Sequence, residues 1–333
     1  MRIELPVRLC RSASGDELQS AHTVDVSNSG VRLAGLQEPL EVGEVLKIEC
    51  SNRRAPFRVV WVGKEGTATA GQAGFECLAS DADMWKLNPR QLENDELLNR
   101  ARVVQCALLP REKPPLKTLD YGGCCIQARM VGGDYYDFLD LNPGEVGFVL
   151  ADVSGKGIPA ALLMASLQGS LHSQCARGSN DLRQLLTSLN FYLHKHTAAS
   201  RYATLFLGCY SDAMRTLDYV NCGHNPPVLL RKGGAVERLN ATATVLGLFP
   251  DWECSVATVK LETGDVLTMY TDGVTETMGD HGKEFGEARL LETLRNSRNL
   301  EAAQILRNIE DELEQFRSGE QGDDLTLVIA RAC

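Results

Sequence analysis

Acidic residues stand at the ends of two runs that have the pattern of neighbouring β-strands. Residues 135–141 and 146–153 both fit a period of two, and the Asn-Pro-Gly sequence at 142–144 between them is typical of a turn. Asp134 precedes the first run and Asp152 lies near the end of the second, so a hairpin would bring both carboxylates to one edge. Clustered carboxylates repel one another unless a cation neutralises them. The spacing therefore indicates a divalent-metal site, with solvated acids at a hairpin end as the alternative.

Two further acidic positions follow the same pattern later in the chain. Asp272 follows the strand-like run 266–270, and Asp323 with Asp324 directly precedes the run 325–330. Four acids at strand ends can share one site only where packed sheets present their strand ends at the same rim. No His or Cys stands beside them, and oxygen ligands alone favour Mg²⁺ or Mn²⁺ over Zn²⁺.

The elements that must position these acids come in blocks of strands and helices. From residue 116 onward this arrangement favours an α+β fold over a doubly wound parallel sheet. Helices are predicted at 159–176, at 181–193 with Asp181 as the N-cap, at 287–297 and at 300–316. Strands are predicted at 123–130, 135–141, 146–153, 204–210, 216–221, 228–230, 236–239, 256–261, 266–270 and 325–330. Two sheets flanked by helices would account for this inventory.

The first 80 residues have a different pattern, with short apolar alternations separated by Gly, Asn and Pro, which predicts a small β-barrel or sandwich. Residues 25–30 match D-x-S-x-x-G, and together with residues 74–76 they resemble a PilZ domain. PilZ domains are typically cyclic-di-GMP receptors, and the family uses an R-x-x-x-R segment before the first strand. Arg8 and Arg11 have the wrong spacing for that segment. We therefore expect a degenerate domain used for dimerisation or for another signal, without cyclic-di-GMP binding.

A linker helix is predicted between the two regions. Leu97, Ala101, Val104 and Leu108 form one apolar seam, and the prolines that follow residue 109 end the helix. The seam either packs against its own catalytic domain or pairs with a second chain in a homodimer. The predicted domains are 1–82 (PilZ-like barrel), 83–112 (linker or regulatory helix) and 113–333 (catalytic domain).

Composition narrows the class of protein. The 333 residues are 44% hydrophobic and carry a net charge of −10, which argues against nucleic acid as a partner. No apolar stretch approaches the length of a membrane span and the N-terminus lacks a signal-like apolar region, so we expect a cytoplasmic protein with no membrane association. The 11 cysteines have no metal-ligand spacing and are expected to be reduced.

Residues 92–333 resemble the SpoIIE/RsbU branch of the PPM family of metal-dependent protein serine/threonine phosphatases. Ala101, Gln105 and the Leu-Leu-Pro at 108–110 resemble the regulatory helix of this branch. The matching catalytic segments are 131–137, 151–157, 221–227, 270–276 and 322–326.

The resemblance implies an α-β-β-α sandwich with two Mn²⁺ or Mg²⁺ ions at one end. By position, Asp152 would bridge both ions with the carbonyl of Val153 as a further ligand, Asp134 and Asp272 would complete the coordination, and Asp323 would hold the second ion. Asp137 and Asp324 are second-choice ligands. Arg129 stands where some members place a phosphate-contacting arginine.

The chemistry implied is in-line attack of a metal-activated water on phosphorus, with no phosphoenzyme. Ser154 stands where some members have a general-acid His, so the general acid is unassigned. His224 is interpreted as a turn residue instead of an acid, and the Gly-Lys-Gly at 155–157 as a tight turn instead of a phosphate loop. Residues 279–284 are predicted to form a mobile flap over the site.

The sequence therefore predicts a phosphatase acting on phosphoserine or phosphothreonine. By resemblance, its substrate would be a phosphorylated STAS-domain anti-anti-sigma protein in bacterial partner switching. The alternative is a catalytically weak, PilZ-led scaffold or cyclic-di-GMP-responsive binding protein. A nucleotide-dependent kinase is excluded because no Gly-rich phosphate loop with its lysine is present.

Overall fold

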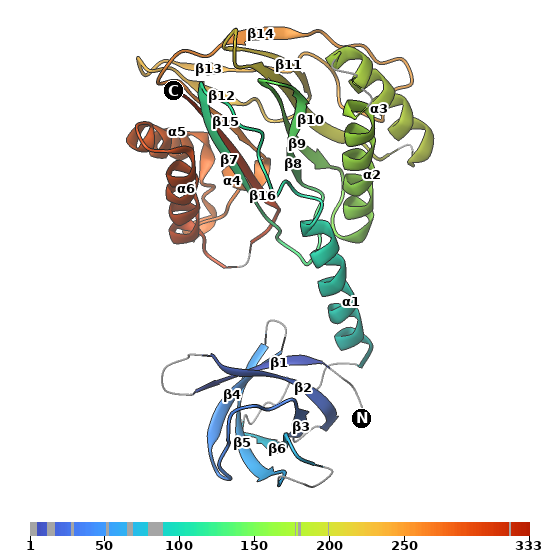
Figure 1. Cartoon of the computed structure of the whole chain (residues 1–333), viewed down its shortest axis with the longest axis vertical. Helices are drawn as coiled ribbons and strands as arrows, with labels where there is room; N and C mark the ends of the chain where they lie inside the picture. Colours follow the sequence, from blue (N-terminus) through green and yellow to red (C-terminus); the bar gives the residue numbers. More distant parts are fainter. Residues whose placement is uncertain are drawn as a thin grey trace. The chain divides into compact units, whose positions relative to one another are not determined.

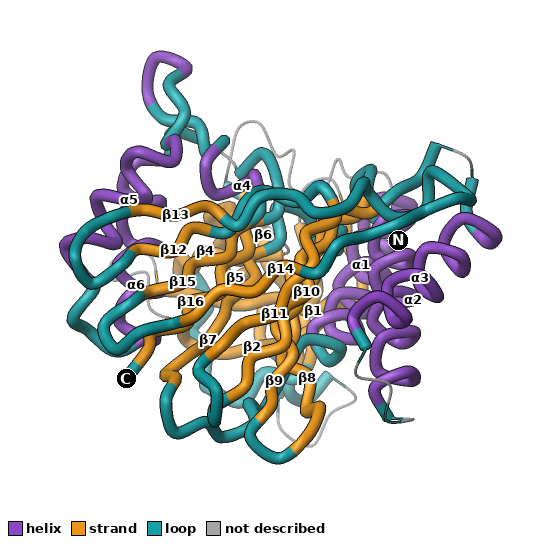
Figure 2. Tube along the Cα trace, turned by 90° about the horizontal axis from the view of Figure 1, so that it is seen from above, coloured by secondary structure: helices purple, strands orange, loops and turns teal. Residues whose placement is uncertain are grey.

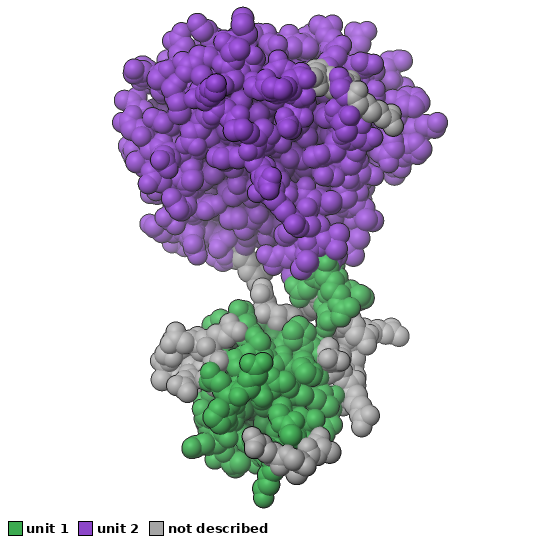
Figure 3. Space-filling model, viewed as in Figure 1, with its two compact units in different colours: residues 1–100 green, residues 101–333 purple. Residues whose placement is uncertain are grey.

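The computed structural model describes residues 5–11, 17–27, 30–50, 53–64, 69–78, 89–176, 178, 181–198, 200–319 and 321–333. The chain forms two compact units, residues 1–100 and residues 101–333 (Figure 3). The division falls inside helix α1 (Pro89–Cys106), within the segment predicted to be the linker.

The N-terminal unit contains a closed antiparallel barrel with strand order β1-β2-β3-β6-β5-β4 (Figure 1). Buried and exposed residues alternate along its strands, and Leu9, Leu33, Ile48 and Phe57 fill the interior. The barrel or sandwich predicted from the sequence is thus a barrel. Its strands are β1 (Pro6–Arg11), β2 (Glu17–Ser27), β3 (Gly30–Ala34), β4 (Val45–Cys50), β5 (Arg53–Val62) and β6 (Gln72–Cys77).

The C-terminal unit is a sandwich of two five-stranded antiparallel sheets. The first has the order β14-β11-β10-β9-β8, with β8 (Tyr135–Asn142), β9 (Glu145–Val153), β10 (Ala203–Ser211), β11 (Thr216–Cys222) and β14 (Ala257–Lys260). The second has the order β13-β12-β15-β16-β7, with β7 (Leu119–Ile126), β12 (Val228–Leu230), β13 (Val236–Arg238), β15 (Val266–Tyr270) and β16 (Leu325–Ala332).

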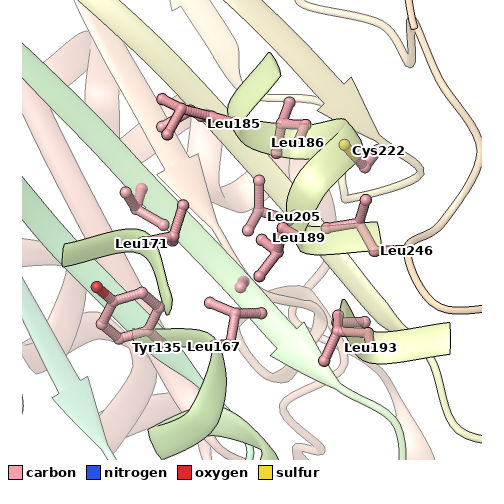
Figure 4. Packing of buried hydrophobic residues seen from close by; sticks show 14 of the residues in the cluster. Tyr135, Leu167, Leu171, Leu185, Leu186, Leu189, Leu193, Leu205, Cys222 and Leu246 are labelled. Atoms are coloured by element: carbon pink, nitrogen blue, oxygen red, sulfur yellow. The ribbon is translucent and has the colours of Figure 1, made fainter. Parts of the chain in front are cut away.

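Helices cover both outer faces of the sandwich, as Figures 1 and 2 show. Helices α2 (Ile158–Cys175) and α3 (Leu182–His196) pack on the first sheet, where Leu167, Leu171 and Leu189 meet Tyr135 and Leu205 (Figure 4). Helices α5 (Gly286–Ser297) and α6 (Ala302–Phe316) pack on the second. The predicted α-β-β-α sandwich is confirmed.

Local signals set the helix ends. The side chain of Asp181 accepts a hydrogen bond from the backbone N of Arg183 at 2.9 Å, which confirms it as the N-cap of α3. Pro159 lies in the first turn of α2, where its missing N–H costs nothing. No helix among the described residues is long and apolar enough to span a membrane.

One strand lies four residues earlier than predicted: β7 covers Leu119–Ile126, whereas 123–130 was expected. The backbone after Ile126 leaves the sheet because it forms hydrogen bonds with the side chain of Asp324. Asp324 accepts hydrogen bonds from the backbone N of Ala128 at 2.9 Å and of Gly133 at 2.8 Å. These bonds hold residues 127–133 as a loop.

Most of the predicted apolar seam of helix α1 is exposed: Leu97, Ala101 and Val104 are exposed, and Leu108 is half-buried. The buried residue of this turn is polar: Gln105 is only 4% exposed. Packing of the seam on the catalytic domain, one of the two alternatives, is therefore not observed at Ala101 and Val104.

Candidate metal centre

The strand register brings the predicted acids to one end of each sheet. Tyr135 pairs with Ala151, so Asp134 and Asp152 lie at the same end of the β8–β9 hairpin. In the other sheet Tyr270 pairs with Leu327, so the segments that carry Asp272 and Asp323 also leave at one end. The charge of Asp152 raises the pKa of Asp134, and the charges of Asp272 and Asp323 in the other sheet raise the pKa of Asp152. The structure thus brings the four predicted aspartates together.

Asp134 lies at the centre of the rim and is 3% exposed. Its Oδ2 accepts hydrogen bonds from Thr271 Oγ1 at 2.8 Å and from Thr326 Oγ1 at 2.6 Å, both from the opposite sheet. Burial first, and then the charge of Asp152, raises the pKa of Asp134 well above its usual range, while the two hydroxyl donors oppose this shift. These two hydroxyl donors hold the carboxylate in place.

Asp152, near the end of β9, has its pKa raised to about 7 by burial and then by the charges of Asp272 and Asp323. The adjacent backbone is close to Gly133, where a Cβ would lie 2.8 Å from the carbonyl oxygen of Val153 and 3.5 Å from Asp152 Oδ1. A side chain at position 133 would therefore crowd the carboxylate and the carbonyl that were predicted to bind metal.

Asp272 begins helix α4 (Asp272–Thr275) directly after β15. Burial and the charge of Asp323 raise its pKa, whereas the backbone N–H of Gly273 lowers it. Gly273 is required by close packing, because a Cβ there would lie 1.9 Å from the carbonyl oxygen of Asp324.

Asp323 is already paired with a lysine. Its Oδ2 lies 2.5 Å from Lys156 Nζ, and its Oδ1 accepts a hydrogen bond from the backbone N of Asp324 at 2.9 Å. Lys156 comes from the Gly-Lys-Gly turn that follows β9, and Gly155 and Gly157 have φ angles of 101° and 71°. The turn interpretation is correct, but the ion pair that Lys156 forms from this turn was not predicted from the sequence.

The second-choice ligands, Asp324 and Asp137, form hydrogen bonds with other parts of the chain. Asp324 holds the 127–133 loop through the two backbone bonds described above. Asp137 accepts hydrogen bonds from Tyr135 Oη at 2.5 Å and from the backbone N of Phe138 at 2.7 Å, and its Oδ2 lies 2.6 Å from His172 Nε2. Asp137 therefore anchors helix α2 to β8 and does not join the four aspartates.

Other residues singled out from the sequence have clear positions. Arg129 is exposed in the loop before Gly132. His224 is 5% exposed, its Nδ1 lies 2.9 Å from Thr204 Oγ1, and burial lowers its pKa to about 4, so a structural role fits it better than acid catalysis. Ser154 Oγ accepts a hydrogen bond from the backbone N of Tyr202 at 2.9 Å, which fixes the turn after β9.

The predicted flap is a short turn containing a 3₁₀ segment, η1 (Asp280–Gly282). Backbone bonds from Gly279 N to Lys283 O at 2.8 Å and from Ser318 N to Met278 O at 3.0 Å close it and tie it to the segment after α6. Its base, Met278, lines a pocket together with Lys156 and Asp323. Whether the turn moves stays a prediction.

Three polar side chains support the site: two threonines that were not singled out from the sequence, and Gln105, which was noted only for its resemblance to the regulatory helix. Thr271 and Thr326 hold Asp134, and a signal was present, since Thr271 directly follows the predicted strand 266–270 and Thr326 is the second residue of the predicted strand 325–330. Gln105 supports the other side of the loop: its Oε1 accepts from Gly132 N at 3.1 Å and its Nε2 donates to Gly132 O at 2.7 Å. Gln127 Nε2 also donates to Gln105 Oε1, at 2.7 Å.

The donor set fits a hard divalent cation in its chemistry. It consists of carboxylates and a backbone carbonyl, and the charges of neighbouring carboxylates raise the pKa values of Asp134, Asp152 and Asp272. In the described part of the chain, no three Asp, Glu, His or Cys side chains are placed so that they could hold an ion without rearrangement. The pairing of Asp323 with Lys156 is one contact that an ion would have to replace.

Comparisons with known proteins agree with this architecture. Residues 142–332 match the family model for stage II sporulation protein E (SpoIIE), and residues 1–88 match the PilZ domain. The chain is 32% identical over 233 residues to the phosphoserine phosphatase RsbU of Bacillus subtilis, which covers 69% of this chain and 68% of RsbU.

Solved structures show the same fold. The SiaA-PP2C domain of Pseudomonas aeruginosa aligns with a TM-score of 0.65 at 22% identity, covering 73% of this chain and 98% of that domain. The RsbU and RsbW domains of Rv1364c from Mycobacterium tuberculosis align with a TM-score of 0.56 at 26% identity, covering 68% and 63%. RsbX in complex with magnesium aligns with a TM-score of 0.51 at 15% identity, covering 67% and 99%. The chain therefore belongs to the SpoIIE family of PPM-type protein serine/threonine phosphatases and carries an N-terminal PilZ domain.

Proposed function

We propose that the chain hydrolyses phosphoserine or phosphothreonine on a regulatory protein, using two Mg²⁺ or Mn²⁺ ions. The observation that carries the proposal is the convergence of four aspartates from two sheets on one rim, where burial and repulsion by neighbouring acids raise the pKa values of Asp134, Asp152 and Asp272. Such a cluster destabilises the fold without a cation, so its presence favours a metal-dependent function over a scaffold.

The proposed ligands are Asp134, Asp152, Asp272, Asp323 and the carbonyl of Val153. When bound, the ions would supply Lewis acidity to activate water and to neutralise charge on the phosphoryl oxygens.

The chain's own residues position that chemistry. The two threonine hydroxyls orient Asp134, leaving its Oδ1 free of the hydrogen bonds that occupy Oδ2. Gly133 keeps the space beside Asp152 and Val153 open. Arg129, exposed near the loop, would contact the substrate phosphate.

For the substrate we propose a phosphorylated STAS-domain protein of a partner-switching pathway. The similarity to RsbU and to a protein with RsbU and RsbW domains supports this choice. The net charge of −10 also favours a protein partner over nucleic acid.

We further propose that the chain comprises a PilZ-like domain (1–82), a linker helix (83–112) and a phosphatase domain (113–333), with activity adjusted through the helix. Gln105 supports this role because it bonds both backbone groups of Gly132, two residues before Asp134. The exposed seam of α1 supports a homodimer, since apolar residues on one helix face gain stability by pairing. Cyclic-di-GMP is not part of the proposal: Arg8 pairs with Glu49 at 3.0 Å.

Phosphate release tests the function directly. The full-length chain should release phosphate from a phosphorylated STAS-domain protein and from an aryl phosphate with Mn²⁺, and should release none with EDTA. Asp152→Asn should lose at least about a thousandfold in turnover, because it removes the shared ligand. Asp140→Asn, an exposed residue at the other end of β8, should retain full activity. Unchanged turnover in Asp152→Asn would contradict the metal assignment.

A further inference from the structure

The lysine of the Gly-Lys-Gly turn is bonded to Asp323, one of the proposed metal ligands. Lys156 Nζ lies 2.5 Å from Asp323 Oδ2 and 3.1 Å from the carbonyl oxygen of Gly322. The other oxygen of Asp323 accepts the backbone N–H of Asp324. Both oxygens of this proposed ligand are therefore already engaged within the chain.

Lys156 acts on the whole cluster as well as on Asp323. Burial and neighbouring acids raise the pKa values of Asp152, Asp272 and Glu276, and the positive charge of Lys156 lowers all three. Lys156 therefore acts as a built-in counter-ion to the aspartates.

We propose that Lys156 competes with the second divalent cation for Asp323 and moves toward Glu276 when the cation binds. This inference rests on the metal site proposed above. A Mg²⁺ or Mn²⁺ ion binds carboxylate oxygen at about 2.1 Å, so it would share Asp323 with an ammonium group at hydrogen-bond distance. At that separation the metal ion and the ammonium group of Lys156 would repel each other strongly. The ammonium must leave for the ion to bind tightly.

The structure provides room and a partner for the displaced side chain. A pocket of about 260 Å³ adjoins Asp323 and is lined by Lys156, Glu276, Met278 and Arg317 among others. Glu276 is exposed and already interacts electrostatically with Lys156. The lysine can therefore exchange one carboxylate for another across a single pocket.

The backbone of the turn need not move for this exchange. Ser154 bonds Tyr202 through its side chain and its backbone N, and Arg201 Nη1 donates to the carbonyl of Ser154 at 2.8 Å. These bonds fix the turn to the strand beside it, while Lys156 itself is 47% exposed. The motion is confined to one long side chain, which fits a rapid equilibrium instead of a domain rearrangement.

Metal titration of the full-length chain tests the proposal. Mn²⁺ binding by isothermal calorimetry should resolve a tighter and a weaker class of site in the wild type. Lys156→Gln should tighten the weaker class by about two- to fivefold, the range expected for releasing an exposed ion pair. It should leave the tighter class unchanged. Lys283→Gln, which removes the same charge from the nearby turn, should change neither.

A second readout separates local competition from a general charge effect. In EDTA, Lys156→Gln should melt at a lower temperature than the wild type because the cluster loses its counter-ion. With saturating Mn²⁺ the two should melt together. Equal tightening of both classes, or the same tightening in Lys283→Gln, would overturn the proposal.

The outcomes also distinguish this inference from the proposed function. If the wild type binds no Mn²⁺ in calorimetry or in Mn²⁺ electron paramagnetic resonance, the metal site itself is refuted and this inference with it. If two classes appear and Lys156→Gln binds like the wild type, the metal site stands and only the competition is refuted.

Discussion

Replacing Asp152 by Asn should stabilise the fold while removing the proposed activity. Burial and neighbouring acids raise the folded-state pKa of Asp152 to about 7, against a usual value of 3.8. The folded chain therefore holds this proton more tightly than the unfolded chain does. The stability that protonation contributes is complete below about pH 4 and is lost as the pH rises through about 7.

The change in unfolding free energy follows from the difference between the folded-state and usual pKa values of Asp152. Each pH unit between the two pKa values corresponds to about 1.4 kcal/mol, so an ionised Asp152 costs the fold at most about 4 kcal/mol at pH 8. Solvent screening at the partly exposed rim reduces the expected cost to about 2 kcal/mol. Asn has nearly the same shape and no charge. The variant should gain about 2 kcal/mol in unfolding free energy at pH 8 and about nothing at pH 4.

Urea unfolding in EDTA, followed by far-ultraviolet circular dichroism at pH 4, 6 and 8, measures this difference. The full-length chain is used, and the wild-type curve at each pH removes the contribution of the barrel. Asp140→Asn provides the matched control, since its exposed carboxylate lies at the opposite end of β8 and should change stability little at any pH. Destabilisation of Asp152→Asn at pH 8, or an equal gain at pH 4 and pH 8, would refute the electrostatic reasoning.

Three further changes probe the supporting residues. Thr326→Val removes a 2.6 Å hydrogen bond to the buried carboxylate of Asp134 without opening a cavity, so Mn²⁺ affinity in calorimetry should fall about tenfold or more. Wild-type affinity in this variant would show that Thr326 is not needed to hold Asp134 in place. Gln105→Ala leaves both backbone groups of Gly132 without their partner, so phosphate release should fall several-fold while the melting temperature of the barrel is unchanged; unaltered turnover would remove the helix from the regulatory proposal. Gly132→Ala should lower the unfolding free energy by about 1–3 kcal/mol because its Cβ would lie 1.9 Å from a carboxylate oxygen. The control Gly169→Ala, in open space on helix α2, should be neutral or stabilising, and equal effects of the two alanines would contradict the packing argument.

The sequence predicted the two layers of the fold and the positions of the four aspartates at strand ends, because both depend on local pattern. Alternation over residues 135–153 and the turn between the runs determine the hairpin, and the hairpin alone puts Asp134 beside Asp152. The periodic apolar faces of α2 and α3 likewise led directly to observed helices. These features follow from neighbours within about twenty residues.

What the sequence did not predict depends on contacts between distant segments. β7 ends early because the carboxylate of Asp324, almost two hundred residues away in the sequence, accepts a hydrogen bond from the backbone N–H of Ala128. The pairing of Lys156 with Asp323 and the hydroxyl bonds to Asp134 link segments of similar separation. The seam of α1 was read from its apolar residues, whereas the residue that the fold buries is Gln105, whose amide satisfies a loop backbone.

The two threonine bonds to Asp134 have a consequence for how such a site can be built or changed. One carboxylate oxygen, at the residue before β8 of the first sheet, accepts hydrogen bonds from a hydroxyl directly after β15 and from a hydroxyl on β16 of the second sheet. If the two sheets shift relative to each other by about an ångström, both hydrogen bonds lengthen and the carboxylate of Asp134 is no longer held in one orientation. Grafting the acidic loops onto another scaffold would therefore not reproduce the site, because its accuracy belongs to the alignment of the two layers and not to the loops that carry the charges.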